Sequence, residues 1–61
     1  MSNANIPKDP MILLSYINTK LRDIYPSLDI LCNDLLISKE DLIDKLNAIG
    51  YNYDVSVNRF I

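Results

Sequence analysis

The stretch SLDILCNDLLISKEDLIDKLNAIGY, residues 27–51, contains two short helical patterns separated by only a few residues. Ser27 and Ser38 precede these patterns, where a side-chain oxygen can accept a hydrogen bond from the first N–H groups of a helix. Apolar residues follow each serine at helical spacing, and Gly50 lies where a helix commonly ends. Two short helices joined by so tight a turn must pack closely, which restricts the chain to a small helical fold.

A third helix precedes this pair. Asp9 is a good N-cap, Pro10 suits the first helical position, and Pro26 disfavours helical geometry at the residue before it. We therefore expect helices near residues 10–25, 27–36 and 38–49. Their inward-facing side chains, chosen by helical spacing, are Met11, Leu14, Ile17 or Asn18, Leu21, Ile24, Leu28, Leu31, Cys32, Leu35, Leu42, Leu46 and Ile49.

Residues 51–61, YNYDVSVNRFI, change from helical to alternating spacing. Tyr51 and Tyr53 would share one face of an extended segment, and Phe60 would meet them from a returning strand after a turn at 54–58. A lone hairpin is marginal in water, so these aromatic side chains would pack on the helices. The predicted fold is mainly α, a three-helix domain with a short C-terminal β-hairpin.

The helix pair resembles the helix-turn-helix of bacterial repressors, and the added hairpin gives the outline of a small winged helix. Cys32 occupies the position of the small residue in the first helix of the pair, and Ile37 that of the residue that anchors the turn. Leu36 departs from the pattern, because glycine is usual there. A leucine at that point is strained if the backbone φ is positive.

The chain is expected to form one helix-turn-helix-like domain over residues 5–61, after a disordered start or purification-tag remnant at residues 1–4. Of its 61 residues, 49% are hydrophobic, which is ample for one core and more than three short helices easily hide. The sequence contains no apolar stretch of membrane-spanning length and no signal-peptide pattern. We therefore predict a cytoplasmic location and no membrane partner.

Charge argues against DNA recognition by the helix pair. Residues 27–49 contain Lys39 and Lys45 against five carboxylates, Asp29, Asp34, Glu40, Asp41 and Asp44. A site-specific DNA-binding protein commonly neutralises about 6–10 phosphates, which requires positive charge. Nucleic-acid binding remains an alternative if a dimer gathers the other basic residues, Lys8, Lys20, Arg22 and Arg59, on one side.

Longer motifs give a closer resemblance. NIPKDP, LLSYINTKLRD, SLDILCNDL and GYNYD followed by NRF together resemble a family of very small bacterial proteins known only as a domain of unknown function. The resemblance covers residues 5–61 and offers no activity to transfer. It implies a free-standing module rather than a fragment of an enzyme.

The family motifs include a polar signature on the first helix, formed by Asn18, Thr19, Lys20, Arg22 and Asp23. One interpretation is a recognition surface for a partner. The other is structural: Asn18 and Thr19 bond neighbouring backbone while Arg22 and Asp23 brace the fold. Arg22 is also a candidate for a bidentate pair with Asp29 or Asp34, which would tie the first helix to the second.

Groups typical of catalysis are scarce. The chain has no histidine and one glycine, so it lacks the usual neutral-pH acid–base group and a glycine-rich phosphate loop. Cys32, the only cysteine, has neither a disulfide partner nor metal-ligand spacing, and its position suggests a core residue. We predict no enzyme activity, catalytic residue, cofactor or metal site.

The leading hypothesis is a protein-interaction module that binds a protein partner or self-associates as a homodimer. Apolar side chains are in surplus, since Met11, Ile12, Leu13, Ile30, Leu36, Ile43, Val55 and Val57 cannot all join the core. The predicted partner-binding residues are Ile12, Leu13, Asn18, Thr19, Lys20, Arg22 and Ile43. The alternative is a nucleic-acid-binding or transcription-associated regulator, and a toxin–antitoxin or phage-type regulator rests on size alone.

Overall fold

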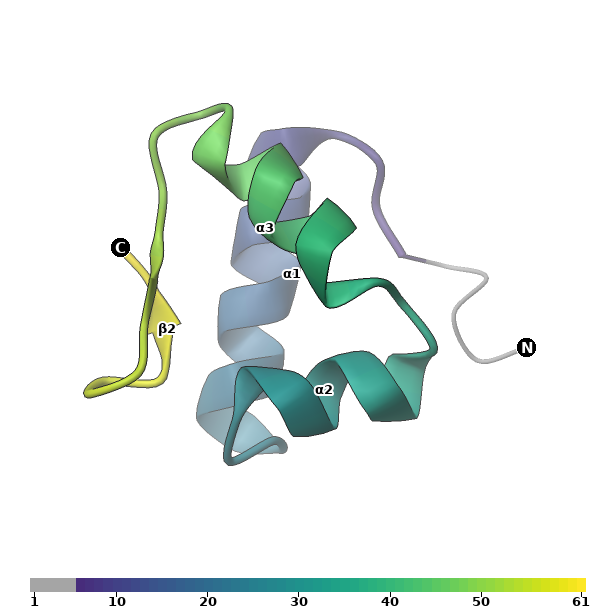
Figure 1. Ribbon diagram of the computed structural model, residues 1–61, viewed down its shortest axis with the longest axis vertical. Helices are drawn as coiled ribbons and strands as arrows, with labels where there is room; N and C mark the ends of the chain where they lie inside the picture. Colours follow the sequence, from purple (N-terminus) through teal and green to yellow (C-terminus); the bar gives the residue numbers. More distant parts are fainter. Residues whose placement is uncertain (1–5) are drawn as a thin grey trace.

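The computed structural model describes residues 6–61. These residues form the helices α1 (Pro10–Asp23), α2 (Leu28–Leu35) and α3 (Lys39–Asn47), then an antiparallel hairpin of β1 (Tyr53–Asp54) and β2 (Arg59–Phe60). In Figure 1, α1 lies behind α2 and α3, and the hairpin lies to one side. The mainly α fold with a C-terminal hairpin is therefore confirmed, whereas residues 1–4 lie outside the described part.

Each helix begins where its capping residue predicts. The side-chain oxygens of Asp9, Ser27 and Ser38 accept hydrogen bonds of 3.1, 3.2 and 3.2 Å from the backbone N–H groups of Ile12, Ile30 and Asp41. The helices are shorter than the predicted ranges, because local bonds replace regular helix at their ends. At the end of α1, for example, the N–H groups of Ile24 and Tyr25 share the carbonyl of Lys20.

Leu36 and Gly50 occupy equivalent left-handed positions after α2 and α3. Gly50 has φ 86°, and its N–H bonds the carbonyl of Asn47 while the N–H of Tyr51 bonds that of Leu46. This pair of bonds is the Schellman pattern that glycine favours. Leu36 has φ 59° and ψ 44°. The condition for strain at Leu36 is thus met, and a side chain occupies a conformation that glycine adopts more readily.

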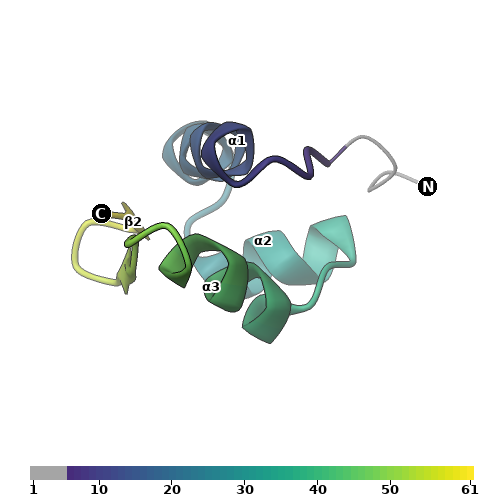
Figure 2. The same ribbon diagram turned by 90° about the horizontal axis from the view of Figure 1, so that it is seen from above.

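The core lies where the three helices meet the hairpin. Figure 2 views α1 nearly end-on, with α2 and α3 on one side of it and the hairpin beside them. The buried apolar residues are Leu13, Leu14, Ile17, Leu21, Leu28, Leu31, Cys32, Leu35, Leu42, Leu46 and Phe60. The predicted inward residues of α2 are all correct. In α3, Leu42 and Leu46 are buried, and Ile49, two residues beyond the end of the helix, is half-buried.

The predicted inward face of α1 needs a correction. Leu13 is buried, at 2% exposure, whereas Met11 and Ile24 are exposed at 55% and 58%. The buried arc of α1 is centred near Ile17, so Met11 falls on the adjoining face with Asn18. Ile24 follows the last residue of α1 and no longer continues the helical spacing.

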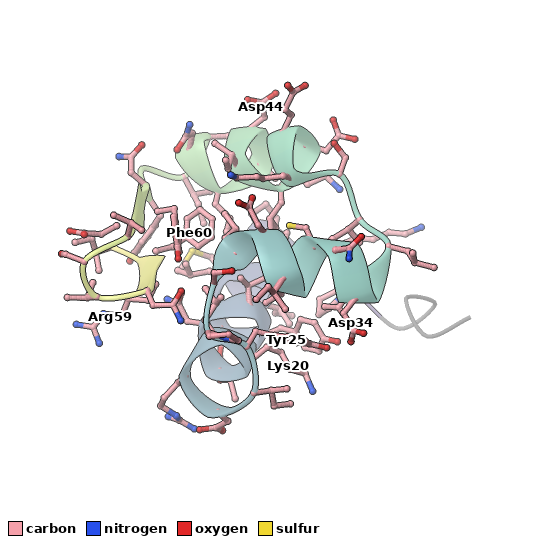
Figure 3. All side chains as sticks on the ribbon, turned by 60° about the horizontal axis from the view of Figure 1, so that its bottom comes forward. Lys20, Tyr25, Asp34, Asp44, Arg59 and Phe60 are labelled. Carbon is pink, nitrogen blue, oxygen red and sulfur yellow. The ribbon has the colours of Figure 1, made fainter. Side chains whose placement is uncertain are left out.

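The hairpin forms as predicted. Tyr53 pairs with Phe60 across the strands, and their ring centroids are 5.5 Å apart. The Asp54 carboxylate accepts bonds from the N–H and hydroxyl of Ser56, which closes the turn and lowers the pKa of Asp54. In Figure 3, Phe60 points from the hairpin toward the helices. None of the helices in residues 6–61 is long and apolar enough to cross a membrane.

The two left-handed positions make a paired stability prediction. Leu36→Gly should raise the free energy of unfolding by about 0.5–1 kcal/mol, because glycine relieves the backbone strain. The side chain removed is 68% exposed, so little burial is lost. Gly50→Ala should lower the free energy of unfolding by about 1 kcal/mol, because an alanine is strained at the positive φ of this position. No atom lies within 4 Å of the added Cβ, so no steric clash contributes to the loss. Chemical denaturation measures both, and effects of the same sign would contradict this account.

Candidate functional site

A groove of about 940 Å³ runs between α1 and the hairpin. Its base is formed by side chains that also belong to the core, including Leu14, Leu21 and Phe60. The remaining lining residues are Met11, Ser15, Asn18, Thr19 and Arg22 from α1, and Tyr51, Val57, Asn58, Arg59 and Ile61 from the C-terminal segment. Among the described residues, no group of three or more Cys, Asp or Glu side chains is arranged to hold a metal ion.

Asn18 fixes the hairpin to α1. Its Nδ2 donates to the Phe60 carbonyl at 3.0 Å, and the Phe60 N–H donates to its Oδ1 at 2.8 Å. The neighbouring pair, Asn52 and Ile61, exchanges both backbone bonds across the strands. The Tyr53–Phe60 pair is consequently the kind whose backbone groups point outward. The Asn18 amide therefore replaces a third strand at this edge.

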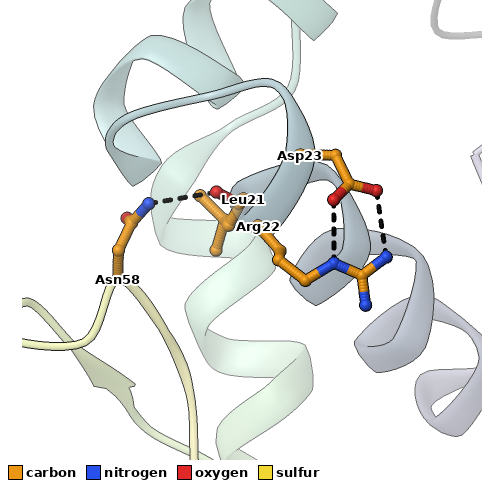
Figure 4. Close-up of polar contacts among 4 residues, drawn as sticks. All are labelled: Leu21, Arg22, Asp23 and Asn58. Carbon is orange, nitrogen blue, oxygen red and sulfur yellow. Dashed lines mark hydrogen bonds and ion pairs between the residues drawn. The ribbon is translucent and has the colours of Figure 1, made fainter.

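Asn58 makes a second connection, at the far end of α1. Its Nδ2 donates to the carbonyls of Leu21 and Tyr25 at 3.2 and 3.1 Å, and its Oδ1 accepts from the Tyr53 hydroxyl. Carbonyls in the last turn of a helix lack partners within the helix. The amide satisfies one of these, that of Leu21, and also the carbonyl of Tyr25 just beyond α1. The bond to Leu21 is drawn in Figure 4. The hairpin is thus attached to α1 at two places.

Arg22 does not pair with Asp29 or Asp34, so that prediction is wrong. Figure 4 shows Arg22 bound through Nε and one terminal nitrogen to Asp23, at 2.8 and 3.0 Å. Asp29 instead pairs with Lys39 at 2.7 Å, and Asp34 accepts a bond from the Tyr25 hydroxyl. The hydrogen bonds between Arg22 and Asp23 lower the pKa of Asp23 and raise that of Arg22. An exposed pair of neighbours contributes little to stability.

The structure brings three predicted partner-binding residues into the groove, namely Asn18, Thr19 and Arg22. Asn18 bonds backbone, as the structural interpretation proposed, but that backbone is 42 residues away rather than neighbouring. Lys20 lies outside this lining, with its Nζ 5.3 Å from the centre of the Tyr16 ring. The polar signature therefore divides between a structural contact and exposed positions in the groove.

The predicted apolar contact residues do not form one face. Leu13 lies in the core, so it must be withdrawn from the exposed set. Ile43 is half-buried against the core, and Ile12 is 59% exposed but does not line the groove. A role of these apolar residues in partner binding stays a prediction, and of the three only Ile12 is exposed.

Sequence reasoning missed most of the hairpin side of the groove. Asn58 and Phe60 both belong to the N-x-F motif noted in the sequence, so a signal was present. The motif does not show that its residues contact Asn18, Leu21 and Tyr25 on a distant helix. Arg59, the middle residue of the motif, and Ile61, which follows it, become groove residues only when the motif docks.

The nucleic-acid alternative requires the four basic residues on one side of a dimer, and the structure shows how they lie within a single chain. Arg22 and Arg59 line the groove. Lys20 lies against Tyr16. Lys8 precedes α1, and Arg22 lies more than three helical turns further along the chain, near the other end of that helix. On α3, Lys39 is engaged by Asp29. The described chain therefore places two of the four basic residues together.

The sequence model of a family described as Domain of unknown function (DUF4250) matches residues 7–60. The match covers most of the chain, so the chain belongs to this family, and the resemblance seen in its motifs is confirmed. No curated protein and no solved structure matches the chain.

Asn18→Ala is expected to destabilise the fold by about 2–3 kcal/mol, because it leaves two buried backbone groups of Phe60 without partners. Thr19→Ala is the matched control: this neighbour is exposed on the same helix, and its loss should change the free energy of unfolding by less than about 0.5 kcal/mol. Urea denaturation followed by circular dichroism measures both. Equal stabilities for the two variants would remove Asn18 from its structural role.

Proposed function

We propose that this member of a family of unknown function is a small, non-catalytic protein-interaction module that binds its partner in the groove between α1 and the hairpin. The observation that supports this most is the apolar surface there. Met11, Val57 and Ile61 line the groove and remain 55%, 50% and 53% exposed. Grouped apolar side chains with polar neighbours are typical of protein-binding surfaces.

The walls of the groove are fixed before any partner arrives. Asn18 holds β2 against the middle of α1, and Asn58 holds the turn against its last residues. A surface that is already ordered avoids much of the entropy cost of association. The two connections therefore support a role in which the groove is presented to a partner in one conformation.

The ionisable groups of the groove suit binding better than catalysis. Among the described residues that line it there is no Asp, Glu, Cys or His side chain, so the hydroxyls of Ser15 and Thr19 have no such general base beside them in the groove. The charged side chains of the lining, Arg22 and Arg59, carry guanidinium groups, which donate hydrogen bonds and accept none. Cys32 is buried, and burial raises the pKa of its thiol, which disfavours the nucleophilic thiolate.

We favour a different protein as the partner over a second copy. A twofold axis through the groove would bring Arg22 and Arg59 of both copies to one interface, where like charges repel. Nucleic acid is also less favoured, because two arginines are few beside the roughly 6–10 phosphates that site-specific proteins neutralise. The homodimer and the cytoplasmic location remain parts of the sequence-based hypothesis.

The proposal predicts that groove variants lose peptide binding. Random peptides displayed on phage are selected on the immobilised chain, and the affinities of enriched peptides are then measured by fluorescence anisotropy. Met11→Glu should weaken binding by at least about tenfold, because it places a charge on an apolar contact. Circular dichroism checks that the variant is folded.

Ile30→Glu provides the matched control, since Ile30 is 49% exposed but lies on α2 outside the groove. It should leave the affinities unchanged. If both variants bind as the wild type does, or if only Ile30→Glu loses binding, the groove is not the interaction surface.

A further inference from the structure

The charged side chains that line the groove are both arginines, in a chain that is negative overall. The lining contains Arg22 and Arg59 and no carboxylate side chain, whereas the formal net charge of the chain is −2. Arg59 points away from the core in Figure 3. Arg22 is engaged by Asp23 through Nε and one terminal nitrogen, which leaves its other terminal nitrogen outside the pair.

We infer that the groove accepts an acidic amphipathic helix of another protein. This inference rests on the proposed function and specifies the partner. Carboxylates on the incoming helix would pair with Arg22 and Arg59, and apolar side chains would cover Met11, Val57 and Ile61. The other faces help to select this site, since α2 and α3 expose several carboxylates that repel an acidic segment.

The backbone of β2 favours a helix over an added strand. An incoming strand needs unpaired N–H and C=O groups along a sheet edge. At Phe60 both groups are already bonded to the Asn18 amide. A helix satisfies its own backbone bonds and needs only side-chain contacts. Strand addition to β2 is therefore blocked at this point, while helix docking is not.

The positions of the contacts define a pattern for the partner. Asn58 bonds Leu21, and Phe60 bonds Asn18. Arg59, which lies between Asn58 and Phe60 in the chain, is therefore near the C-terminal end of α1, where Arg22 also lies. Met11 lies in the first turn, about 16 Å away along the helix axis. The matching segment is about three turns long, with carboxylates gathered at one end and apolar side chains extending toward the other.

The test uses three fluorescein-labelled synthetic peptides of about 14 residues, long enough for nearly four helical turns. All have the same leucine stripe, and they differ only in having Glu, Gln or Lys at the positions facing the arginines. Fluorescence anisotropy with the full chain should show the Glu peptide binding about fivefold more tightly than the Gln peptide and tenfold or more above the Lys peptide. Added salt should reduce these differences.

Arg59→Gln should remove most of the preference for the Glu peptide. Lys45→Gln is its control, because it removes one positive charge from an exposed position on α3 outside the groove. If the Glu and Gln peptides bind equally tightly, and both lose binding to the Met11→Glu variant, the partner is not selected for acidic residues. That result would overturn the inference of an acidic partner but would still support the groove as the interaction surface. Failure of all three peptides to bind saturably would overturn the helical partner. The phage selection decides separately whether the groove binds peptides at all.

A labelled DNA duplex is measured in the same way. Tighter binding of the duplex than of the Glu peptide, weakened by Arg59→Gln and by salt, would assign the arginines to phosphate binding and overturn the inference.

Discussion

The two hydrogen bonds between the Asn18 amide and the backbone of Phe60 are the contact on which the rest of the structure depends. Each strand of the hairpin is only two residues long, and a hairpin that short is not stable alone in water. Phe60 nevertheless supplies a buried ring to the core, at 1% exposure. Its backbone must be buried with it, and unpaired groups there would cost about 1–3 kcal/mol each. In a chain this small the net stability is only about 3–5 kcal/mol.

The groove is a consequence of the same contact. Because β2 docks on α1 through a side-chain amide, the two elements are separated by the length of that side chain. Apolar residues of α1 and of the C-terminal segment line the space between them. Successive residues of α1 then take different roles because each turns by 100°. Asn18 faces the hairpin, while Thr19 and Arg22 lie on the exposed side of the groove. A signature that looks uniform in the sequence is therefore partly scaffold and partly surface.

What the sequence could predict was set by local chemistry. Asp9, Ser27 and Ser38 cap helices through bonds to residues three positions away, and Gly50 ends α3 through its own backbone freedom. The partner of Asn18, in contrast, lies 42 residues away, and helical spacing carries no information about it. The pairing of Arg22 failed for a related reason. The predicted pair depended on which of several donors lies close to Asp29 and Asp34 in the folded chain. Those donors are Lys39 for Asp29 and the Tyr25 hydroxyl for Asp34.

The helix pair in residues 27–49 shows why spacing alone is a poor guide to function. Cys32 is buried and Ile37 packs against the core, which satisfies the packing that a tight helix–turn–helix needs. The same segment exposes carboxylates, and its Lys39 is bound to Asp29. Asp44 and Arg59 point in different directions in Figure 3. Packing rules repeat among small helical domains whatever they bind, whereas recognition depends on exposed charge. In this chain the positive charge and the open apolar surface coincide in the groove along α1, and that coincidence places the candidate site there rather than on α3.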